Sequence, residues 1–128
     1  MKILLDTHAF LWMVEGSDLL SPVARETILN DTKHLYLSAA SYWEICIKLS
    51  LEKLVLSKGW ESNFERELEF NDVRWLPIER SHCIKLSTLT FHHRDPFDRL
   101  LVSQAHVEEL TVLTRDPEFG AYEVETIW

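Results

Sequence analysis

The fold is decided by the first stretch of the chain, Lys2-Ile3-Leu4-Leu5-Asp6-Thr7. A short apolar run that ends at an acidic residue is typical of a buried strand, and residues 8–15 follow with a helical pattern of apolar positions. The same arrangement returns at Thr111-Val112-Leu113, which is followed by Asp116. We therefore expect an α/β protein with a parallel sheet, in which Asp6 and Asp116 leave the carboxyl ends of two strands.

Apolar periodicity and cap residues predict the remaining elements. Strands are expected at residues 35–38 and 73–76, and helices over residues 22–31, 42–51, 79–86 and 96–107. The residues in position to cap three of these helices are Ser21, Ser41 and Asp95. Within the polar segment 52–72, one amphipathic helix is expected, with an apolar stripe at Trp60, Phe64 and Leu68. Such a stripe packs into the core or forms a surface for a partner.

Four carboxylates are placed where a parallel α/β fold directs side chains into one crevice: Asp6, Glu44, Asp98 and Asp116. Acids gathered in one place repel one another unless a cation joins them. Carboxylate oxygens are hard ligands that favour Mg²⁺ or Mn²⁺. The first hypothesis is therefore metal-assisted chemistry on a phosphate group.

Three of the four acids also have an ordinary structural explanation. Glu44 lies three residues after Ser41, as in a capping box, and four residues before Lys48, as in an exposed ion pair. Asp98 lies in the first turn of a helix, where the helix dipole favours an acid. Asp116 precedes Pro117 and suits a helix cap. The functional interpretation rests on the set of four.

The net charge excludes a general electrostatic grip on nucleic acid. The chain has 21 acidic and 13 basic residues, which give a charge of −8. A polyanionic substrate would need bound metal and a local basic rim, and the cations that lie beside the four acids in sequence are Lys48, Arg94, Arg99 and Arg115. Ordinary solvated charge is the alternative for each of them. An acidic surface also suits a basic protein partner.

Length and composition indicate a single domain, residues 1–128, in a reducing compartment. Cys46 and Cys83 occur within apolar helical patterns, so we expect buried, reduced thiols. No apolar run approaches the roughly 20 residues of a membrane span, and Asp6 interrupts the N-terminus before a signal-peptide core could form. These features predict a cytoplasmic protein with no membrane contact.

Four ordered segments together resemble the PIN-domain family, and more narrowly the VapC-type toxins of bacterial toxin–antitoxin pairs. The segments are Leu4–Trp12, Ser41–Ile45, Asp95–Leu101 and Leu113–Asp116. Any one of them is weakly specific, whereas the ordered set is strongly specific. The resemblance spans the chain from residue 3 to the last strand.

The resemblance implies a three-layer fold, with a central parallel sheet of four to five short strands flanked by helices. It implies a Mg²⁺- or Mn²⁺-dependent endoribonuclease whose four family acids match Asp6, Glu44, Asp98 and Asp116. It also implies an RNA substrate, a small antitoxin partner and a homodimer. Thr114 matches a small hydroxyl residue near the site. Supporting or substrate-binding roles are assigned to Thr7, Thr114, Lys48, Arg99 and Arg115.

One departure from similar sequences is Glu109, where glycine is often found; it bears on helix termination and not on chemistry. Asp95 belongs to the subfamily pattern, and we assign it only the role of a helix cap.

Other function classes remain open at this stage. The serines lack a Ser-His-acid arrangement, and three scattered glycines cannot form a phosphate-binding loop, so metal-activated water remains. A non-catalytic PIN-like binding module would keep the acidic pocket and use it to receive an arginine from a partner. A metal-dependent DNA nuclease or phosphatase is the third class. His8 stands where an aspartyl phosphatase usually has its second acid, and RNA is preferred to DNA on the resemblance alone.

Overall fold

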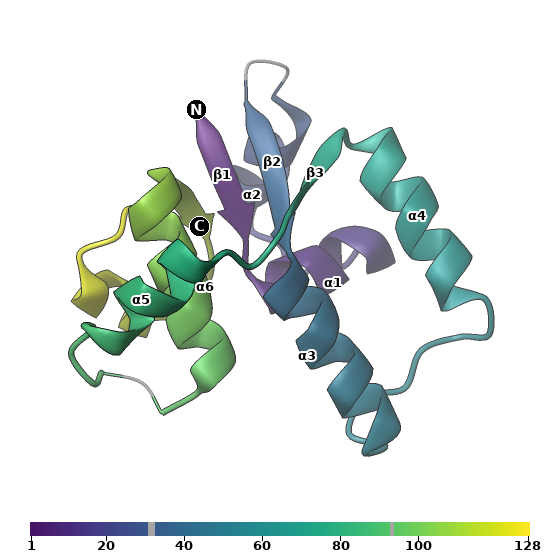
Figure 1. The fold of residues 1–128 in the computed structure, drawn as a ribbon. Coiled ribbons are helices and arrows are strands. Elements are labelled where there is room, and N and C mark those ends of the chain that lie inside the picture. The colour runs from purple at the N-terminus through teal and green to yellow at the C-terminus, as the bar shows by residue number, and fades with distance from the viewer. Residues whose placement is uncertain (31–32, 93) are drawn as a thin grey trace.

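The architecture is a parallel sheet between two layers of helices (Figure 1). It is seen in a computed structural model that describes residues 1–30, 33–92 and 94–128. The five strands are β1 (Lys2–Leu5), β2 (His34–Ser38), β3 (Val73–Leu76), β4 (Thr111–Leu113) and β5 (Thr126–Ile127). All neighbouring pairs are parallel, in the order β3-β2-β1-β4-β5. The expected α/β class and the number of strands are confirmed.

The helices connect these strands on both sides of the sheet. They are α1 (Thr7–Glu15), α2 (Pro22–Leu29), α3 (Ala39–Ser50), α4 (Trp60–Phe70), α5 (Arg80–Ser87) and α6 (Pro96–Glu108), with a 3₁₀-helix η1 (Pro117–Tyr122). The predicted end of the second helix near residue 31 lies outside the described residues. The other predicted elements are confirmed to within a few residues.

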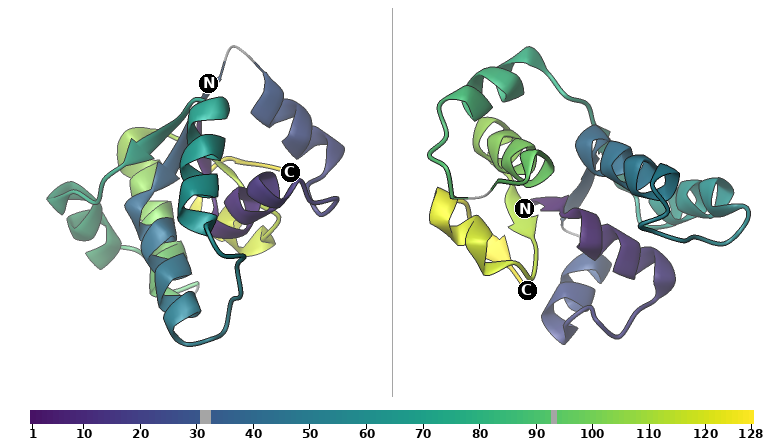
Figure 2. Two further views of the ribbon diagram at one scale, coloured as in Figure 1. Left: turned by 90° about the vertical axis from the view of Figure 1, so that its right-hand side faces the viewer. Right: turned by 90° about the horizontal axis from the view of Figure 1, so that it is seen from below.

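Alternation along the strands divides the core into two halves. Ile3 and Leu5 pack with residues of α1, α2 and α4, whereas Leu4 packs on the opposite face with residues of α5, α6 and η1. Successive side chains of a strand point to opposite faces, so a strand buried on both sides must be apolar throughout. Figure 2 shows α1 and α2 on one side of the sheet and α5 and α6 on the other.

The cap of α3 differs from the prediction. The Oγ atom of Ser38 accepts a hydrogen bond from the Ala40 N–H at 3.0 Å, and Ser41 is fully buried one turn into the helix. The capping box of Ser41 and Glu44 is therefore wrong. The physical reason is that β2 runs directly into α3 without a loop, so the last strand residue serves as the cap.

The aromatic stripe of α4 belongs to the protein's own core. Phe64 is 1% exposed, and its ring makes edge contacts with Phe10 at 5.0 Å and with Tyr42 at 5.9 Å. Trp60 and Leu68 pack against the same cluster. Of the two alternatives for the stripe, the structure supports internal packing.

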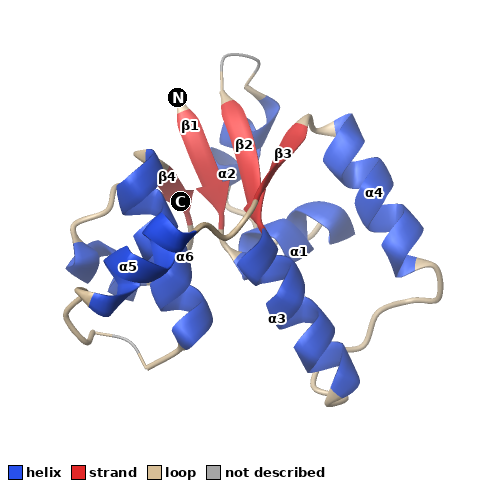
Figure 3. Cartoon of the chain, in the orientation of Figure 1, coloured by secondary structure: helices blue, strands red, loops and turns tan. Residues whose placement is uncertain are grey.

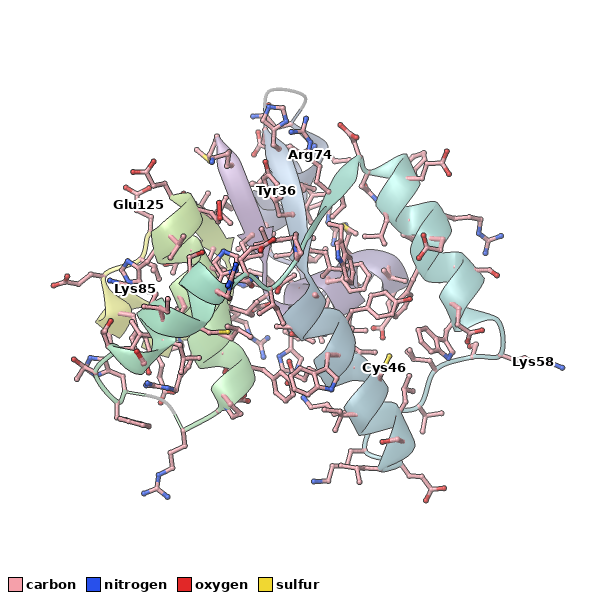
Figure 4. All side chains as sticks on the ribbon, in the orientation of Figure 1. Tyr36, Cys46, Lys58, Arg74, Lys85 and Glu125 are labelled. Carbon is pink, nitrogen blue, oxygen red and sulfur yellow. The ribbon has the colours of Figure 1, made fainter. Side chains whose placement is uncertain are left out.

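The prediction of buried cysteines is wrong. Cys46 and Cys83 are both exposed, and Figure 4 shows Cys46 on the side of α3 nearer α4. In α3 the buried positions include Glu44 and Ile45, which leaves Cys46 on the outer side of the helix. Apolar neighbours in sequence do not reveal which helix face meets the core. Across the part of the chain that the structure describes, no helix has both the length and the apolar character needed to cross a membrane.

Candidate active site

The candidate site lies at the edge of the sheet where the parallel strands end. Figure 3 shows β1 and β2 pointing toward this edge, where α1 and α3 begin. Asp6 joins β1 to α1, and Asp116 follows β4 and caps η1. The two acids share a pocket of about 340 Å³, which is lined by Asp6, His8, Trp12, Arg115, Asp116 and Pro117. The predicted meeting of Asp6 and Asp116 is therefore seen in the structure.

Asp6 is a buried carboxylate that the backbone holds firmly. Asp6 is only 7% exposed, and its Oδ1 atom accepts a hydrogen bond from the Ala9 N–H at 2.7 Å. Its own N–H donates to the Leu113 carbonyl at 3.1 Å, which ties the end of β1 to β4. The residue therefore caps α1 and also faces the pocket.

The surroundings of Asp6 make the ionised form of its carboxyl less favourable than it is in water. Burial raises the pKa of the Asp6 carboxyl, and the neighbouring charge of Asp116 raises it further. Hydrogen bonds from the Thr114 hydroxyl and the Ala9 N–H, together with His8, act in the opposite direction. A cation placed between the two acids would remove the unfavourable part of this balance.

Thr114 connects the two acids of the pocket. It is 3% exposed, and its hydroxyl hydrogen-bonds the Asp6 carboxylate. The Oγ1 atom of Thr114 also accepts the N–H of Asp116 at 3.0 Å. The Oδ1 atom of Asp116 in turn accepts the Glu118 N–H at 2.9 Å. Thr114 therefore hydrogen-bonds to both acids of the pocket.

Glu44 does not line this pocket but is held by Thr7, the residue that follows Asp6. Its Oε1 atom accepts the Thr7 hydroxyl at 2.7 Å, and its Oε2 atom lies 3.0 Å from the Lys48 ammonium. The Thr7 Oγ1 atom also lies 3.0 Å from the Ser41 hydroxyl. The pair with Lys48 is present, although Glu44 is 5% exposed and does not lie on the exposed face that an ordinary surface pair would occupy.

Asp98 lies on α6 and is not among the residues that line the pocket of Asp6 and Asp116. It is half-buried in the first turn, where its N–H donates to the Asp95 cap at 3.4 Å. Beside it, the Phe97 ring meets the Trp43 ring of α3 at 5.3 Å between centroids. Asp98 and Glu44 therefore flank a contact between the two helices that carry them.

Within the described residues, no three His, Cys, Asp or Glu side chains approach closely enough to form a metal-binding group. The structure thus brings Asp6 and Asp116 together and links Glu44 to the residue next to Asp6. Asp98 lies next to the contact between α3 and α6, outside the pocket of Asp6 and Asp116. The donor chemistry suits a hard cation, because the pocket offers carboxylate oxygens and the charge on Asp6 is disfavoured without one.

Arg99 differs from its assignment to the basic rim. It is 5% exposed, its guanidinium donates to the Thr90 carbonyl at 3.1 Å, and it lies 4.0 Å from the centre of the Phe91 ring. It also donates to the Leu89 carbonyl at 3.4 Å. Arg99 supports the loop between α5 and α6, because that loop turns its carbonyl groups toward the helix. Arg115 and Arg94 are exposed, and Lys48 is partly exposed.

Two residues of the pocket were missed by the sequence-based assignment. The hypothesis drawn from the sequence assigns no site role to Trp12, and it uses His8 only as evidence against a phosphatase. Their rings stack at 5.5 Å between centroids on the first turns of α1. The signal was available, because residues four apart on a helix share one face and both lie close to Asp6 in sequence.

A parallel α/β sheet with buried acids at its carboxyl edge defines a class of proteins that act at that edge. The family model of the PIN domain matches residues 3–125, and the chain belongs to this family. This confirms the resemblance and the expected fold. Comparison with curated protein sequences gives no match.

The same fold occurs in solved VapBC structures from several bacteria. VapBC2 from Rickettsia felis, bound to a promoter DNA fragment, matches with a TM-score of 0.71 at 15% identity, over 99% of this chain and 98% of the other. DNA-bound VapBC from Salmonella typhimurium matches with a TM-score of 0.70 at 19% identity, over 99% and 97%. VapBC-5 from Mycobacterium tuberculosis, of the VapBC family of toxin–antitoxin systems, matches with a TM-score of 0.61 at 19% identity, over 98% and 97%.

Proposed function

We propose that the protein is a Mg²⁺- or Mn²⁺-dependent endoribonuclease and the toxin of a toxin–antitoxin pair. The observation that carries the proposal is the buried Asp6 carboxylate, whose pKa is raised by burial and by Asp116 at the carboxyl edge of a PIN domain. A perturbed acid in a pocket is a physical mark of a functional site. The chain length and fold shared with VapBC proteins support the toxin assignment.

The residues divide into ligands and supports. Asp6 and Asp116 would hold the metal, with Asp98 and Glu44 completing the site. Bound metal would supply activated water and neutralise the scissile phosphate. Thr114 hydrogen-bonds to both Asp6 and Asp116 and would hold them in position relative to each other. Thr7 would orient the Glu44 carboxylate through its hydroxyl group. Arg115 is exposed and lines the pocket, and it would contact a phosphate group of the RNA.

The direct test is cleavage of a mixed RNA pool by purified protein at neutral pH. Cleavage is expected with Mg²⁺ or Mn²⁺ and should stop when excess chelator is added. A single-stranded DNA pool of similar length tests the preference for RNA. Equal RNA cleavage with and without chelator would rule out the metal-dependent mechanism.

Asp6→Asn and Asp98→Asn should each lower cleavage by more than about a hundredfold, because each removes a negative oxygen ligand. Circular dichroism should show that both variants keep the fold. The matched control is Asp95→Asn, since Asp95 caps α6 through the Phe97 N–H at 2.8 Å and Asn caps nearly as well. Its activity should remain close to that of the parent. Activity retained in Asp6→Asn would show that Asp6 is only a cap.

A basic antitoxin and a toxin homodimer complete the proposal. Support for the basic antitoxin comes from the likeness to VapBC proteins and from the charge of −8. A second hollow, of about 600 Å³, lies between α4 and the edge strand β3, and its walls combine three acidic side chains with aromatic rings. It is lined by Tyr42, Glu65, Leu68, Glu69, Asp72, Val73 and Trp75. A basic, amphipathic peptide is complementary to such a surface. Size-exclusion chromatography with light scattering tests the homodimer.

A further inference from the structure

A tryptophan forms one wall of the pocket that holds the two acids. Trp12 lies on α1, and its partly buried ring lines the pocket together with Asp6 and Asp116. Trp128 packs against this ring at 5.7 Å between centroids, and both tryptophans pack against the core. The ring is therefore held in place next to the acids.

Two exposed, flat side chains lie against the same tryptophan. The His8 ring stacks on it, with an angle of 27° between the planes. The guanidinium carbon of Arg115 lies 4.9 Å from the centre of the ring. A fixed aromatic ring with an exposed arginine beside it is an arrangement by which proteins hold a nucleobase and its phosphate.

We propose that Trp12, with His8 and Arg115, forms a stacking subsite for the nucleotide next to the scissile phosphate of a single-stranded RNA. The subsite rests on the proposed nuclease function, which it deepens by naming how the strand is held. The pocket volume of about 340 Å³ lies within the range of about 300–1,000 Å³ that small-ligand sites occupy. One nucleotide is a ligand of that size class.

The free protein's own contacts allow such a base to enter. A cation–π contact at an exposed site is weaker than stacking of a base on an aromatic ring. A base can therefore replace the Arg115 guanidinium on the Trp12 ring. The released guanidinium then lies beside the phosphate group of the same nucleotide, where it forms charge-assisted hydrogen bonds.

Stacking also answers the difficulty that the net charge presents. A chain with a charge of −8 cannot hold RNA by general attraction to phosphates. Stacking requires no net positive charge and accepts every base, because each base has a π face. The subsite would therefore position the strand without strong sequence preference.

The test compares a short oligoribonucleotide of about eight nucleotides with an abasic strand of the same length and charge. Binding is measured by fluorescence anisotropy with Ca²⁺ in place of Mg²⁺, since Ca²⁺ also takes oxygen ligands, and strand integrity is checked afterwards. The parent protein should bind the strand with bases about tenfold more tightly or better. Trp12→Leu keeps apolar packing but has no π face, so it should bind both strands equally.

Three further variants make the result specific. Phe70→Leu removes another exposed aromatic ring, at the end of α4, and should keep the preference for bases. Trp12→Phe keeps a smaller ring and should show an intermediate preference, which guards against a folding defect in Trp12→Leu. Arg115→Gln should weaken binding of both strands, because it removes a phosphate contact.

The outcomes separate the subsite from the nuclease activity. The subsite proposal is overturned if the parent protein binds the two strands equally, or if Trp12→Leu still prefers the strand with bases. Either result has this meaning even if the protein cleaves RNA. A preference that depends on Trp12 supports the subsite even if RNA is not cleaved, in which case the proposed nuclease function fails alone.

Discussion

Asp6 is a residue whose charge works against the stability of the metal-free fold. Its pKa lies above the ordinary value of about 4, first because the carboxyl is buried and also because Asp116 is close. The folded state therefore binds the Asp6 proton more tightly than the unfolded chain does. Stability from this group is present at acidic pH and is lost as pH rises from about 4 through the folded pKa.

Asp6→Asn should remove this loss. With chelator present, the variant and the parent should have similar unfolding free energies near pH 4, and the variant should be the more stable at pH 7. Asn preserves the cap on the Ala9 N–H, so no opposing loss is expected. Urea unfolding across this pH range measures the difference, and Asp95→Asn is the control for cap replacement. A less stable variant at pH 7 would contradict the prediction.

The contribution of the Thr7 hydroxyl to stability and activity can be tested by replacing Thr7 with residues of similar size. Thr7→Val keeps the shape but leaves the buried Glu44 carboxylate and the Ser41 hydroxyl without this partner. We expect a loss of about 1–3 kcal/mol in unfolding free energy and a lower rate of RNA cleavage. Thr7→Ser restores the hydroxyl and should recover most of both. Equal stability of Thr7→Val and the parent would show that this hydrogen bond contributes nothing net.

At the scale of the element, α6 ends in a conformation that its sequence disfavours. Glu109 forms the C-cap with φ 56° and ψ 53°, and its N–H donates to the Ala105 carbonyl. A side chain in this left-handed region is strained, whereas glycine is not. Glu109→Gly should raise the unfolding free energy by about 0.5–1 kcal/mol. Glu109→Ala keeps the Cβ atom and should give no such gain, as thermal unfolding of the two variants can show.

Elements were predictable where the signal is local. The apolar run Ile3–Leu5 and the cap at Asp95 each specify structure within a few residues, and both predictions are confirmed. The cap at Ser41 failed because helix α3 begins at the end of a strand, with no loop to mark the boundary. The cysteines failed because burial depends on which face of a helix meets the rest of the fold.

The position of two of the candidate acids could be predicted because the topology of the sheet decides it. Parallel strands bring Asp6 and Asp116 to one edge of the sheet, so the sequence was enough to predict that these two acids lie close together. The hydrogen bond from Thr7 to Glu44 joins residues 37 positions apart. The burial of Arg99 depends on a loop that packs back onto α6. These contacts arise from tertiary packing, which no local pattern encodes.

At the scale of the whole molecule, the acidic surface bears on both RNA and protein partners. With a charge of −8, the protein would gain little affinity for RNA without metal at its acids. A basic partner, in contrast, is attracted to the same surface. A bound antitoxin that places an arginine among the acids would therefore compete with metal.

This competition predicts the behaviour of the gene in cells. Expression of the chain alone should arrest bacterial growth, and co-expression with a neighbouring gene for a small, basic, DNA-binding protein should restore growth. Asp6→Asn should be harmless, because it lacks a metal ligand, whereas Asp95→Asn should remain toxic. If Asp6→Asn arrests growth as the parent does, or if the parent is harmless, the toxin proposal fails. A non-catalytic binding module would then be the better explanation for the acidic pocket.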